Sequence, residues 1–264
     1  MKFLFLLGLF LTGFHSRSQP GISAHRGASG AAPENTLSTF REALKLGVDY
    51  IEIDVRTTKD GRLVILHDGS LDRTTTGSGP VRDKTLPEVK GLSAGKGFGA
   101  RFAGEKVPTL EEVCALLRDW NAGHSDRKVN LYVDCKEVAA GPLVQTLRSY
   151  GLLREAVFYG SDAYLLSLRQ EAPDARLMPS LKKAEDLPAK VQALSPYAFD
   201  VRWNLLSDTL VGQIHRHGIR IFSDALDDFE QPEQYRKAAR MGIDVIQTDF
   251  VSRVREALEG EKKQ

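Results

Sequence analysis

Short apolar runs and longer amphipathic stretches alternate along most of the chain. The short runs are rich in β-branched residues, and the stretches between them place apolar residues three and four positions apart, as in a helix buried on one face. No low-complexity or proline-rich linker interrupts the alternation between residues 21 and 250. The pattern predicts repeated βα units around a parallel sheet. Eight strands are expected, at Ile22–His25, Val48–Val55, Val129–Cys135, Ala156–Gly160, Arg176–Pro179, Tyr197–Val201, Gly218–Ser223 and Asp244–Thr248.

Eight parallel strands with intervening helices are the content of a (β/α)₈ TIM-type barrel, an α/β fold that typically takes about 250 residues. The chain has 264 residues, which suits one such barrel. The first helix is expected from Leu37, with Asn35 or Thr36 as its N-cap, so the stretch beginning at Pro33 needs no catalytic role. The interpretation is a single barrel domain over residues 19–264.

A ninth apolar run, Leu63–His67, follows a Lys-Asp-Gly-Arg turn and predicts a hairpin that extends the second strand beyond the barrel rim. If Asp60 and Gly61 form a two-residue loop, pairing outward from that loop sets Asp54 opposite His67. A carboxylate and an imidazole would then share one face of the hairpin.

Residues 69–107 are rich in glycine and have few periodic apolar positions. They lack the Gly-x-Gly-x-x-Gly and Gly-Lys-Ser/Thr patterns of phosphate-binding loops. This segment is therefore predicted to be a short irregular excursion over the C-terminal face of the barrel.

The first residues have the order of a secretory signal peptide. Lys2 precedes the apolar run 3–11, and a short polar stretch then leads to Ser18. We expect residues 1–18 to be cleaved near Ser18 and the protein to be periplasmic or secreted. The run is about half the roughly 20 residues that a membrane span needs, so no stable membrane insertion is expected.

Composition narrows the possible partners. Lys and Arg number 36 against 35 Asp and Glu, a net charge of +1, so nothing indicates a nucleic-acid partner. Cys114 and Cys135 are too few for a disulfide framework, and two buried free thiols are favoured over a single bridge. The sequence does not indicate the oligomeric state.

In two of the expected strands, ionisable residues are confined to one face. Glu52 and Asp54 alternate with branched apolar residues, and Asp134 and Lys136 do the same in a later strand. If the apolar faces meet the helices, these four side chains point toward the barrel axis at the C-terminal ends of their strands, where barrel enzymes place their catalytic residues.

Three carboxylates in one barrel mouth repel each other and need a cation or a proton. Oxygen ligation by Glu52, Asp54 and Asp134 favours one Mg²⁺ or Ca²⁺ ion over Zn²⁺. The alternative is a buried ion network without metal, in which Arg26 or Lys136 pairs with an acid and one acid is left without a partner.

Two histidines lie at the ends of extended runs near these acids. His25 and His67 suit general acid and base roles, because an imidazole titrates near neutral pH. Arg26 offers a planar fork that matches the oxygens of a phosphate. Metal, arginine, lysine and two histidines together indicate a site for a phosphate ester, with a diester favoured by the need for proton transfer to a leaving oxygen.

These residues fall within motifs that resemble one enzyme family, the glycerophosphodiester phosphodiesterases. The resemblance covers most of residues 22–250, and the motifs occur in the family's order. They are His25-Arg26-Gly27, Pro33-Glu34-Asn35-Thr36, Glu52-Ile53-Asp54, Thr58-Lys59-Asp60-Gly61, His67-Asp68, Asp72-Arg73-Thr74-Thr75 and Thr248-Asp249.

The resemblance implies a barrel like that of phosphatidylinositol-specific phospholipase C and metal-dependent hydrolysis of glycerophosphodiesters to sn-glycerol 3-phosphate and an alcohol. It implies that His25 and His67 form the acid–base pair and that a glycerol hydroxyl of the substrate attacks phosphorus to give a cyclic phosphate. By the same resemblance Arg26 and Lys136 bind the substrate phosphate, and the metal ligands are Glu52, Asp54 and Asp134.

Two stretches depart from the family pattern. Asp134 stands where the family usually has Glu, so the metal must approach more closely or bind through water. Phe222-Ser223-Asp224-Ala225 stands where members often have Trp-Thr-x-Asn, so the wall that contacts the glycerol differs.

The sequence thus predicts a phosphodiesterase for small glycerophosphodiesters. One alternative is a lysophospholipase D-type hydrolase of lysophospholipids, which would need an apolar wall from residues such as Phe98, Phe102 or Trp203. A second alternative is a non-catalytic secreted barrel that binds phosphodiesters.

Overall fold

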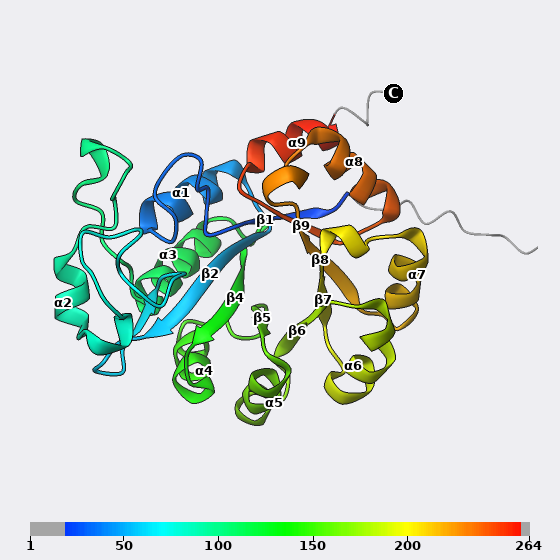
Figure 1. The fold of residues 1–264 in the computed structure, drawn as a ribbon, viewed down its shortest axis with the longest axis horizontal. Helices are drawn as coiled ribbons and strands as arrows, with labels where there is room; N and C mark the ends of the chain where they lie inside the picture. Colours follow the sequence, from blue (N-terminus) through cyan, green and yellow to red (C-terminus); the bar gives the residue numbers. More distant parts are fainter. Residues whose placement is uncertain (1–18, 260–264) are drawn as a thin grey trace, which may run out of the picture.

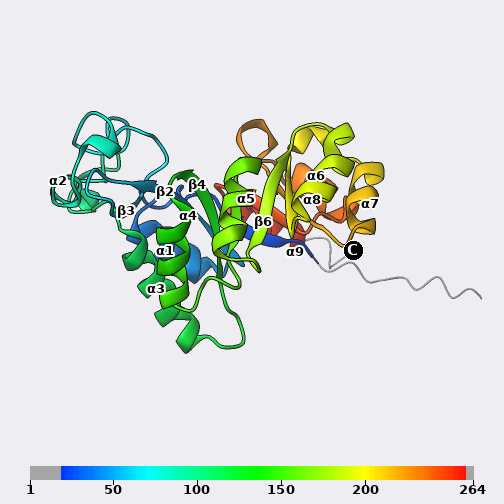
Figure 2. The same ribbon diagram turned by 90° about the horizontal axis from the view of Figure 1, so that it is seen from below.

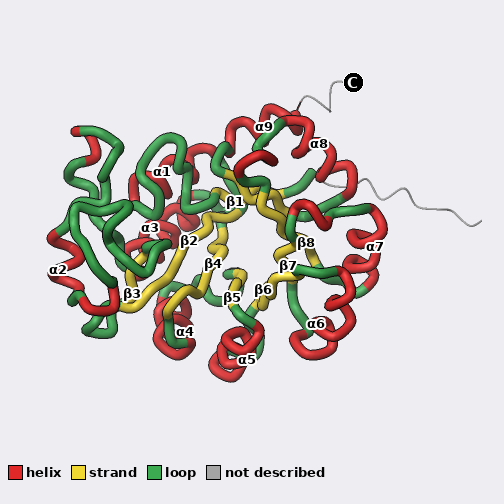
Figure 3. Tube along the Cα trace, in the orientation of Figure 1, coloured by secondary structure: helices red, strands yellow, loops and turns green. Residues whose placement is uncertain are grey.

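Eight parallel strands close into a barrel with helices around its outside (Figures 1 and 3). The structure is a computed structural model that describes residues 19–259. All eight predicted strands are confirmed, with slightly shifted ends, whereas the predicted signal peptide lies outside the described residues. The strands are β1 (Gly21–Ala24), β2 (Tyr50–Thr57), β4 (Asn130–Glu137), β5 (Val157–Gly160), β6 (Arg176–Leu181), β7 (Ala198–Val201), β8 (Arg220–Asp224) and β9 (Val245–Thr248).

The barrel closes where its first strands meet. β1 pairs with β9 on one side and with β2 on the other, and the remaining strands follow in order from β4 to β9. β1 ends at Ala24, but β2 runs on to Thr57. The antiparallel strand β3 (Leu63–Ile65) pairs with this upper half of β2, as the predicted hairpin requires.

The hairpin register differs by one residue from the prediction. Val55 pairs with Ile65, and Gly61 has a φ of 77° in a loop of three residues rather than two. A glycine in the left-handed region is typical of three-residue hairpin loops. Asp54 therefore faces Leu66, whose N–H donates to the Asp54 carbonyl at 2.9 Å, and the expected pairing of Asp54 with His67 is wrong.

Helices cover the outside of the barrel, and Figure 2 shows the same arrangement from the side. Their apolar faces pack on the outward side chains of the strands, including Ile51, Ile53 and Val55, so the acids between those residues face inward as predicted. The helices around the barrel are α1 (Leu37–Leu46), α3 (Leu110–Gly123), α4 (Ala140–Ser149), α5 (Asp162–Glu171), α6 (Leu187–Leu194), α7 (Asp208–Arg216), α8 (Pro232–Met241) and α9 (Val251–Glu259), whereas α2 (Leu86–Gly91) lies in the segment 69–107.

The segment 69–107 is mostly irregular, as predicted, with α2 and short 3₁₀ turns. It packs around its own small apolar cluster, which includes Leu71, Val81 and Val89. In Figure 1 it stands beside β2 and β3 rather than across the barrel axis.

The cysteines and the lengths of the helices are two further features of the described residues. Cys114 and Cys135 are buried and free, and burial raises the pKa of the Cys114 thiol to about 12, so it stays protonated. Among residues 19–259, no helix is long and apolar enough to cross a membrane.

Candidate active site

The interior of the barrel changes from apolar to polar toward the C-terminal ends of the strands. Tyr50 and Tyr132 belong to an apolar cluster that fills the lower barrel. Side chains two and four positions further along each strand point the same way, so Glu52 and Asp54 follow on β2 and Asp134 follows on β4. The predicted acids therefore converge in the mouth of the barrel, the usual position of a barrel active site.

The carboxylates of Glu52, Asp54 and Asp134 form a compact cluster. One oxygen from each lies within 4.8 Å of the others, and no second such group of three potential metal ligands occurs among residues 19–259. Burial raises the pKa of Glu52 well above its usual value, and the neighbouring Asp54 and Asp134 charges raise it further. Burial also raises the pKa of Asp134. A cluster of this kind favours a bound cation.

Two cations already contact the cluster. The Lys136 ammonium lies 2.5 Å from Asp134 Oδ2 and 3.3 Å from Asp54 Oδ1, and Arg26 Nε lies 3.7 Å from Asp54 Oδ2. Burial opposes the charge of Lys136, but these carboxylates raise its pKa, so it is an ammonium at neutral pH. Glu52 forms no ion pair with any described residue; it accepts the Arg26 backbone N–H at 2.7 Å. In the alternative of a buried ion network without metal, Glu52 is therefore the acid that has no cationic partner among the described residues.

A β-bulge places Lys136 in this cluster. Val55 pairs with Cys135 while Arg56 pairs with Glu137, so Lys136 is the extra residue of β4. Bulges bend a strand locally and redirect a side chain, and they are common beside active sites.

Arg26 and Asn35 are both held in the left-handed backbone region, with φ of 54° and 55°. Asn35 N–H donates to the Arg26 carbonyl, and Asn35 Nδ2 donates to Asp54 Oδ2 at 2.7 Å. The expectation that Asn35 serves only the helix start is therefore wrong: Thr36 is the N-cap of α1, and Asn35 orients a predicted metal ligand. Backbone strain of this kind is concentrated at functional sites.

His25 is oriented by an aspartate that directly follows the last strand of the barrel. Its Nδ1 lies 2.9 Å from Asp249 Oδ1, which also accepts the Ser29 hydroxyl at 2.8 Å. Burial alone would raise the pKa of Asp249, but its hydrogen bond to His25 lowers it. The Asp249 backbone N–H donates to the carboxylate of the buried Glu230 at 2.7 Å. This hydrogen bond fixes the backbone of Asp249 beside His25.

His67 has the same arrangement with a different partner. Its Nδ1 lies 2.7 Å from Asp68 Oδ1, and Arg73 binds the same carboxylate. Arg73 also forms two hydrogen bonds to Glu34, which in turn accepts from Arg26 at 3.1 Å. An unbroken chain of ion pairs thus links His67 to Arg26 across the mouth.

The one-residue change in the hairpin does not remove His67 from the site. Lys136 and, more weakly, His67 oppose the rise in the pKa of Asp134, which places the imidazole within electrostatic range of the carboxylate cluster. All seven predicted site residues thus lie in or beside the mouth.

Other functional groups in the mouth were not identified from the sequence. Asp200 on β7 and Asp224 on β8 also point inward, and burial raises the pKa of both, that of Asp200 to about 6. The alternation of Asp200 with apolar neighbours was a usable signal, as it was for Glu52. The roles of Asn35 and Asp249 depend on contacts between distant segments, which no local pattern reveals. Asp68 binds the adjacent His67 and the nearby Arg73.

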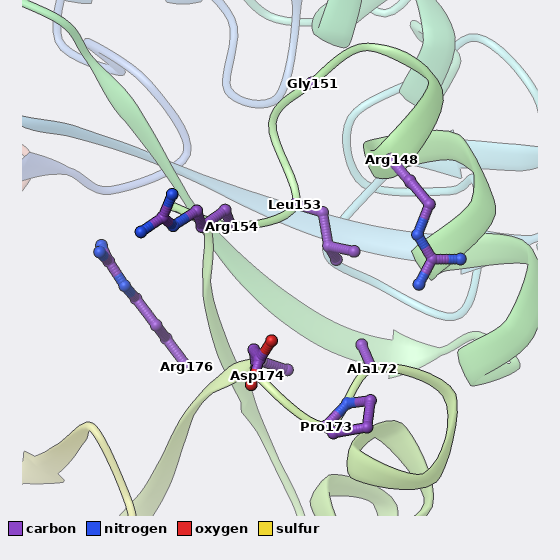
Figure 4. A pocket seen from close by; sticks show the side chains of 9 residues that line it. Arg148, Gly151, Leu153, Arg154, Ala172, Pro173, Asp174 and Arg176 are labelled. Carbon is purple, nitrogen blue, oxygen red and sulfur yellow. The ribbon is translucent and has the colours of Figure 1, made fainter.

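A cavity of 610 Å³ lies at the opposite end of the barrel (Figure 4). It is formed by the loops before β5 and β6 and contains none of the predicted site residues. Two of its arginines are already engaged, Arg148 by the Glu171 carbonyl and Arg176 by Glu155. The chemistry therefore belongs to the mouth and not to this cavity.

The aromatic residues considered for an acyl-binding wall do not gather in one place. Phe98 packs against Phe102 in the segment 69–107, whereas Trp203 packs against Phe229 beyond β7. The structure thus offers no specific support for lysophospholipids over smaller substrates.

A closed parallel barrel whose mouth holds three clustered carboxylates, two aspartate-bound histidines and an arginine defines the class of TIM-barrel hydrolases that act on phosphate esters. The profile of the Glycerophosphoryl diester phosphodiesterase family matches residues 25–253. The chain belongs to this family, as its sequence motifs indicated, and it is an enzyme rather than a non-catalytic binding barrel.

Individual relatives support the same family assignment. A glycerophosphodiester phosphodiesterase of Caldanaerobacter subterraneus subsp. tengcongensis is 35% identical over 237 residues, covering 86% of this chain and 93% of that protein. The crystal structure of a glycerophosphodiester phosphodiesterase from Agrobacterium tumefaciens superposes with a TM-score of 0.80 at 29% identity, covering 90% of this chain and 99% of the other. A phosphodiesterase of Oleispira antarctica, solved in complex with its product sn-glycerol-3-phosphate, gives 0.81 at 25% identity, covering 91% and 97%.

Proposed function

We propose that the enzyme hydrolyses glycerophosphodiesters to sn-glycerol 3-phosphate and an alcohol, with one divalent cation, Mg²⁺ or Ca²⁺, held by Glu52, Asp54 and Asp134. His25 and His67 act as the acid–base pair. The observation that carries this proposal is the clustering of three carboxylate oxygens within 4.8 Å beside two histidines whose Nδ1 atoms are bound by aspartates.

The residues present fit a cation. Among residues 19–259, the cationic side chains that pair with these three carboxylates are Lys136 and Arg26. Asp54 Oδ1 is buried and accepts no hydrogen bond from a described residue. Oxygen donors suit hard cations such as Mg²⁺ and Ca²⁺. When bound, a divalent cation supplies positive charge that stabilises a phosphate and lowers the pKa of a bound hydroxyl.

The cationic side chains of the mouth orient the substrate phosphate. Arg26 is held by Glu34 and lies against Asp54, so its guanidinium is fixed beside the carboxylate cluster. Lys136 keeps its charge because Asp134 and Asp54 surround it. Both groups stabilise the negative charge that develops on phosphate oxygens in the transition state.

The two histidines supply the proton transfers. With Nδ1 bound by an aspartate, each imidazole has Nε2 available for substrate. One imidazole takes the proton of the attacking hydroxyl, and the other gives a proton to the leaving alcohol oxygen. Asp249 and Asp68 fix the ring orientations and stabilise the protonated forms.

The direct test is release of sn-glycerol 3-phosphate from glycerophosphocholine by the purified protein with Mg²⁺, with Ca²⁺ and with chelator. We expect release that depends on the metal. Full activity in excess chelator would contradict the metal site. No release from glycerophosphocholine but release of a lysophosphatidate from a lysophospholipid would establish the lysophospholipase D alternative instead.

Substitution of the histidines tests the acid–base roles. We expect His25→Ala and His67→Ala each to lower kcat by about 10²- to 10⁴-fold with the fold retained, because a positioned acid or base contributes this much. His217→Ala is the matched control, since His217 is exposed at the end of α7, away from the mouth. Wild-type turnover in either mouth variant would remove that histidine from the mechanism.

We also propose that the protein is exported, on the pattern of residues 1–18 alone. N-terminal sequencing of protein secreted by cells that express the full chain tests this. A mature chain that begins near Gln19 is expected, and an intracellular protein that still begins at Met1 would contradict it.

A further inference from the structure

Arg56 is a buried arginine on the inward face of β2, two positions beyond Asp54. It has no part in the motifs identified above, yet all of its contacts lie next to the site. Only 11% of its side chain is exposed, so its charge must be satisfied by protein groups.

At one end, the guanidinium binds the chain that carries His67. Strand β3 ends at Ile65, and the Leu66 N–H makes one further backbone hydrogen bond, to the Asp54 carbonyl. Arg56 Nε donates to the carbonyls of Leu66 and His67 at 3.1 and 3.0 Å, and Nη2 donates to the His67 carbonyl at 2.5 Å. The side chain thus takes over the role of the strand ladder where the ladder has stopped.

At the other end, the same guanidinium binds β4. Nη1 lies 2.9 Å from Glu137 Oε2, immediately after the bulge that directs Lys136 toward Asp134. One rigid, planar group therefore connects the backbone of His67 to the strand that carries Asp134 and Lys136.

We propose that Arg56 is a positioning residue that fixes the His67 backbone relative to the carboxylate cluster. The inference rests on the proposed role of His67. The positioning role of Arg56 differs from the role of Asp68. Asp68 binds the imidazole ring and sets its rotation, whereas Arg56 sets the position of the whole His67 residue.

Arg56→Met is the main variant, since methionine is apolar and donates no hydrogen bond. We expect kcat for glycerophosphocholine to fall about 10- to 100-fold with KM changed less than about threefold, because displacement of a catalytic group by about 1 Å costs up to about 10²-fold. Arg56→Lys, which keeps the charge and some of the donors, should recover part of the loss. Arg62→Met is the matched control: Arg62 lies on the same hairpin but is exposed and bound to Glu111 on the surface, so its kcat should stay at the wild-type value.

Combination with His67→Ala separates positioning from general support of the fold. If Arg56 acts through His67, adding Arg56→Met to His67→Ala causes no further loss of the residual activity per folded molecule. A fold defect would lower activity by the same factor in both backgrounds. Circular dichroism and thermal unfolding give the folded fraction of each variant.

Different results test the positioning role of Arg56 and the proposed role of His67. A kcat for Arg56→Met within twofold of wild type, or a loss that multiplies fully with that of His67→Ala, overturns the role of Arg56. Wild-type activity of His67→Ala overturns the proposed function of His67 instead. If Arg56→Met does not fold, Arg56→Lys and Glu137→Gln decide the question by the same double-mutant comparison, with a threefold or greater loss of kcat expected and an unchanged kcat contradicting the role.

Discussion

Glu52 combines a cost in stability with the role of metal ligand that we propose for it. Its pKa is raised by burial and by two neighbouring acids, so its ionised form destabilises the metal-free fold at every pH above the value in the unfolded chain. Without metal at pH 7, Glu52→Gln should therefore unfold about 3 °C or more above the wild type, and near pH 4 the difference should vanish. With metal, the same variant should lose most of its turnover.

Thermal unfolding in chelator and a metal-supplemented assay measure these two effects. Glu185→Gln, an exposed glutamate outside the mouth, is the control and should change neither. A Glu52→Gln variant that is less stable than the wild type in chelator would show that the carboxylate is adequately paired without a metal.

Asp200 gives a second pH-dependent prediction at the level of one residue. Its pKa is raised to about 6 by burial, so folding favours the protonated acid. The destabilisation is absent below about pH 4, grows as pH rises to about 6 and is constant above it, with an upper limit of about 3 kcal/mol. Asp200→Asn should thus be more stable than the wild type above pH 6 and equal to it near pH 4. Urea unfolding at several pH values in chelator measures this difference, with the exposed Asp228→Asn as control. A gain in the free energy of unfolding that does not depend on pH would exclude titration of Asp200 as its source.

At the scale of elements, ion pairs connect the loop after β3 to the loop after β1. Arg73 joins Asp68 to Glu34, and through them His67 to Arg26. Arg73→Met should lower kcat about tenfold or more, because Asp68 then loses the partner that fixes it against the imidazole. Steady-state kinetics measure the effect. Arg82→Met, an exposed arginine of the same segment, is the control, and equal kinetics for both variants would show that the network is not needed for turnover.

Elements were more predictable than the contacts between them. The eight barrel strands and the inward acids could be predicted because alternation within one strand, as at Glu52 and Asp54, is a local property. The hairpin register was missed because the sequence Asp60-Gly61 suits a loop of two or of three residues. A type I′ loop of two residues needs a positive φ at both, and Asp60 does not adopt one. The hydrogen bond from Asn35 to Asp54 was also not predicted. The neighbouring Thr36 fills the capping role, and the bond to Asp54 joins segments that the sequence does not show to be adjacent.

For the molecule as a whole, metal binding and stability are linked. A ligand that binds only the folded barrel stabilises it by about 2.7 kcal/mol at a hundredfold excess over its Kd, which corresponds to a rise in Tm of about 5–10 °C for a chain of this size. We expect this rise with Mg²⁺ or Ca²⁺ by differential scanning calorimetry. Glu52→Gln should abolish most of it and Glu185→Gln none; the same rise in both variants would place the bound ion outside the carboxylate cluster.

The His25–Asp249 hydrogen bond joins residues that are 224 positions apart. During synthesis His25 therefore precedes its partner by 224 residues, and Asp249 is added only two residues before α9 begins. A nascent or truncated chain that stops short of Asp249 therefore carries every predicted metal ligand but an unsupported imidazole. Catalytic competence should consequently appear only after the last strand of the barrel and Asp249 have been synthesised, so that shorter chains are inactive.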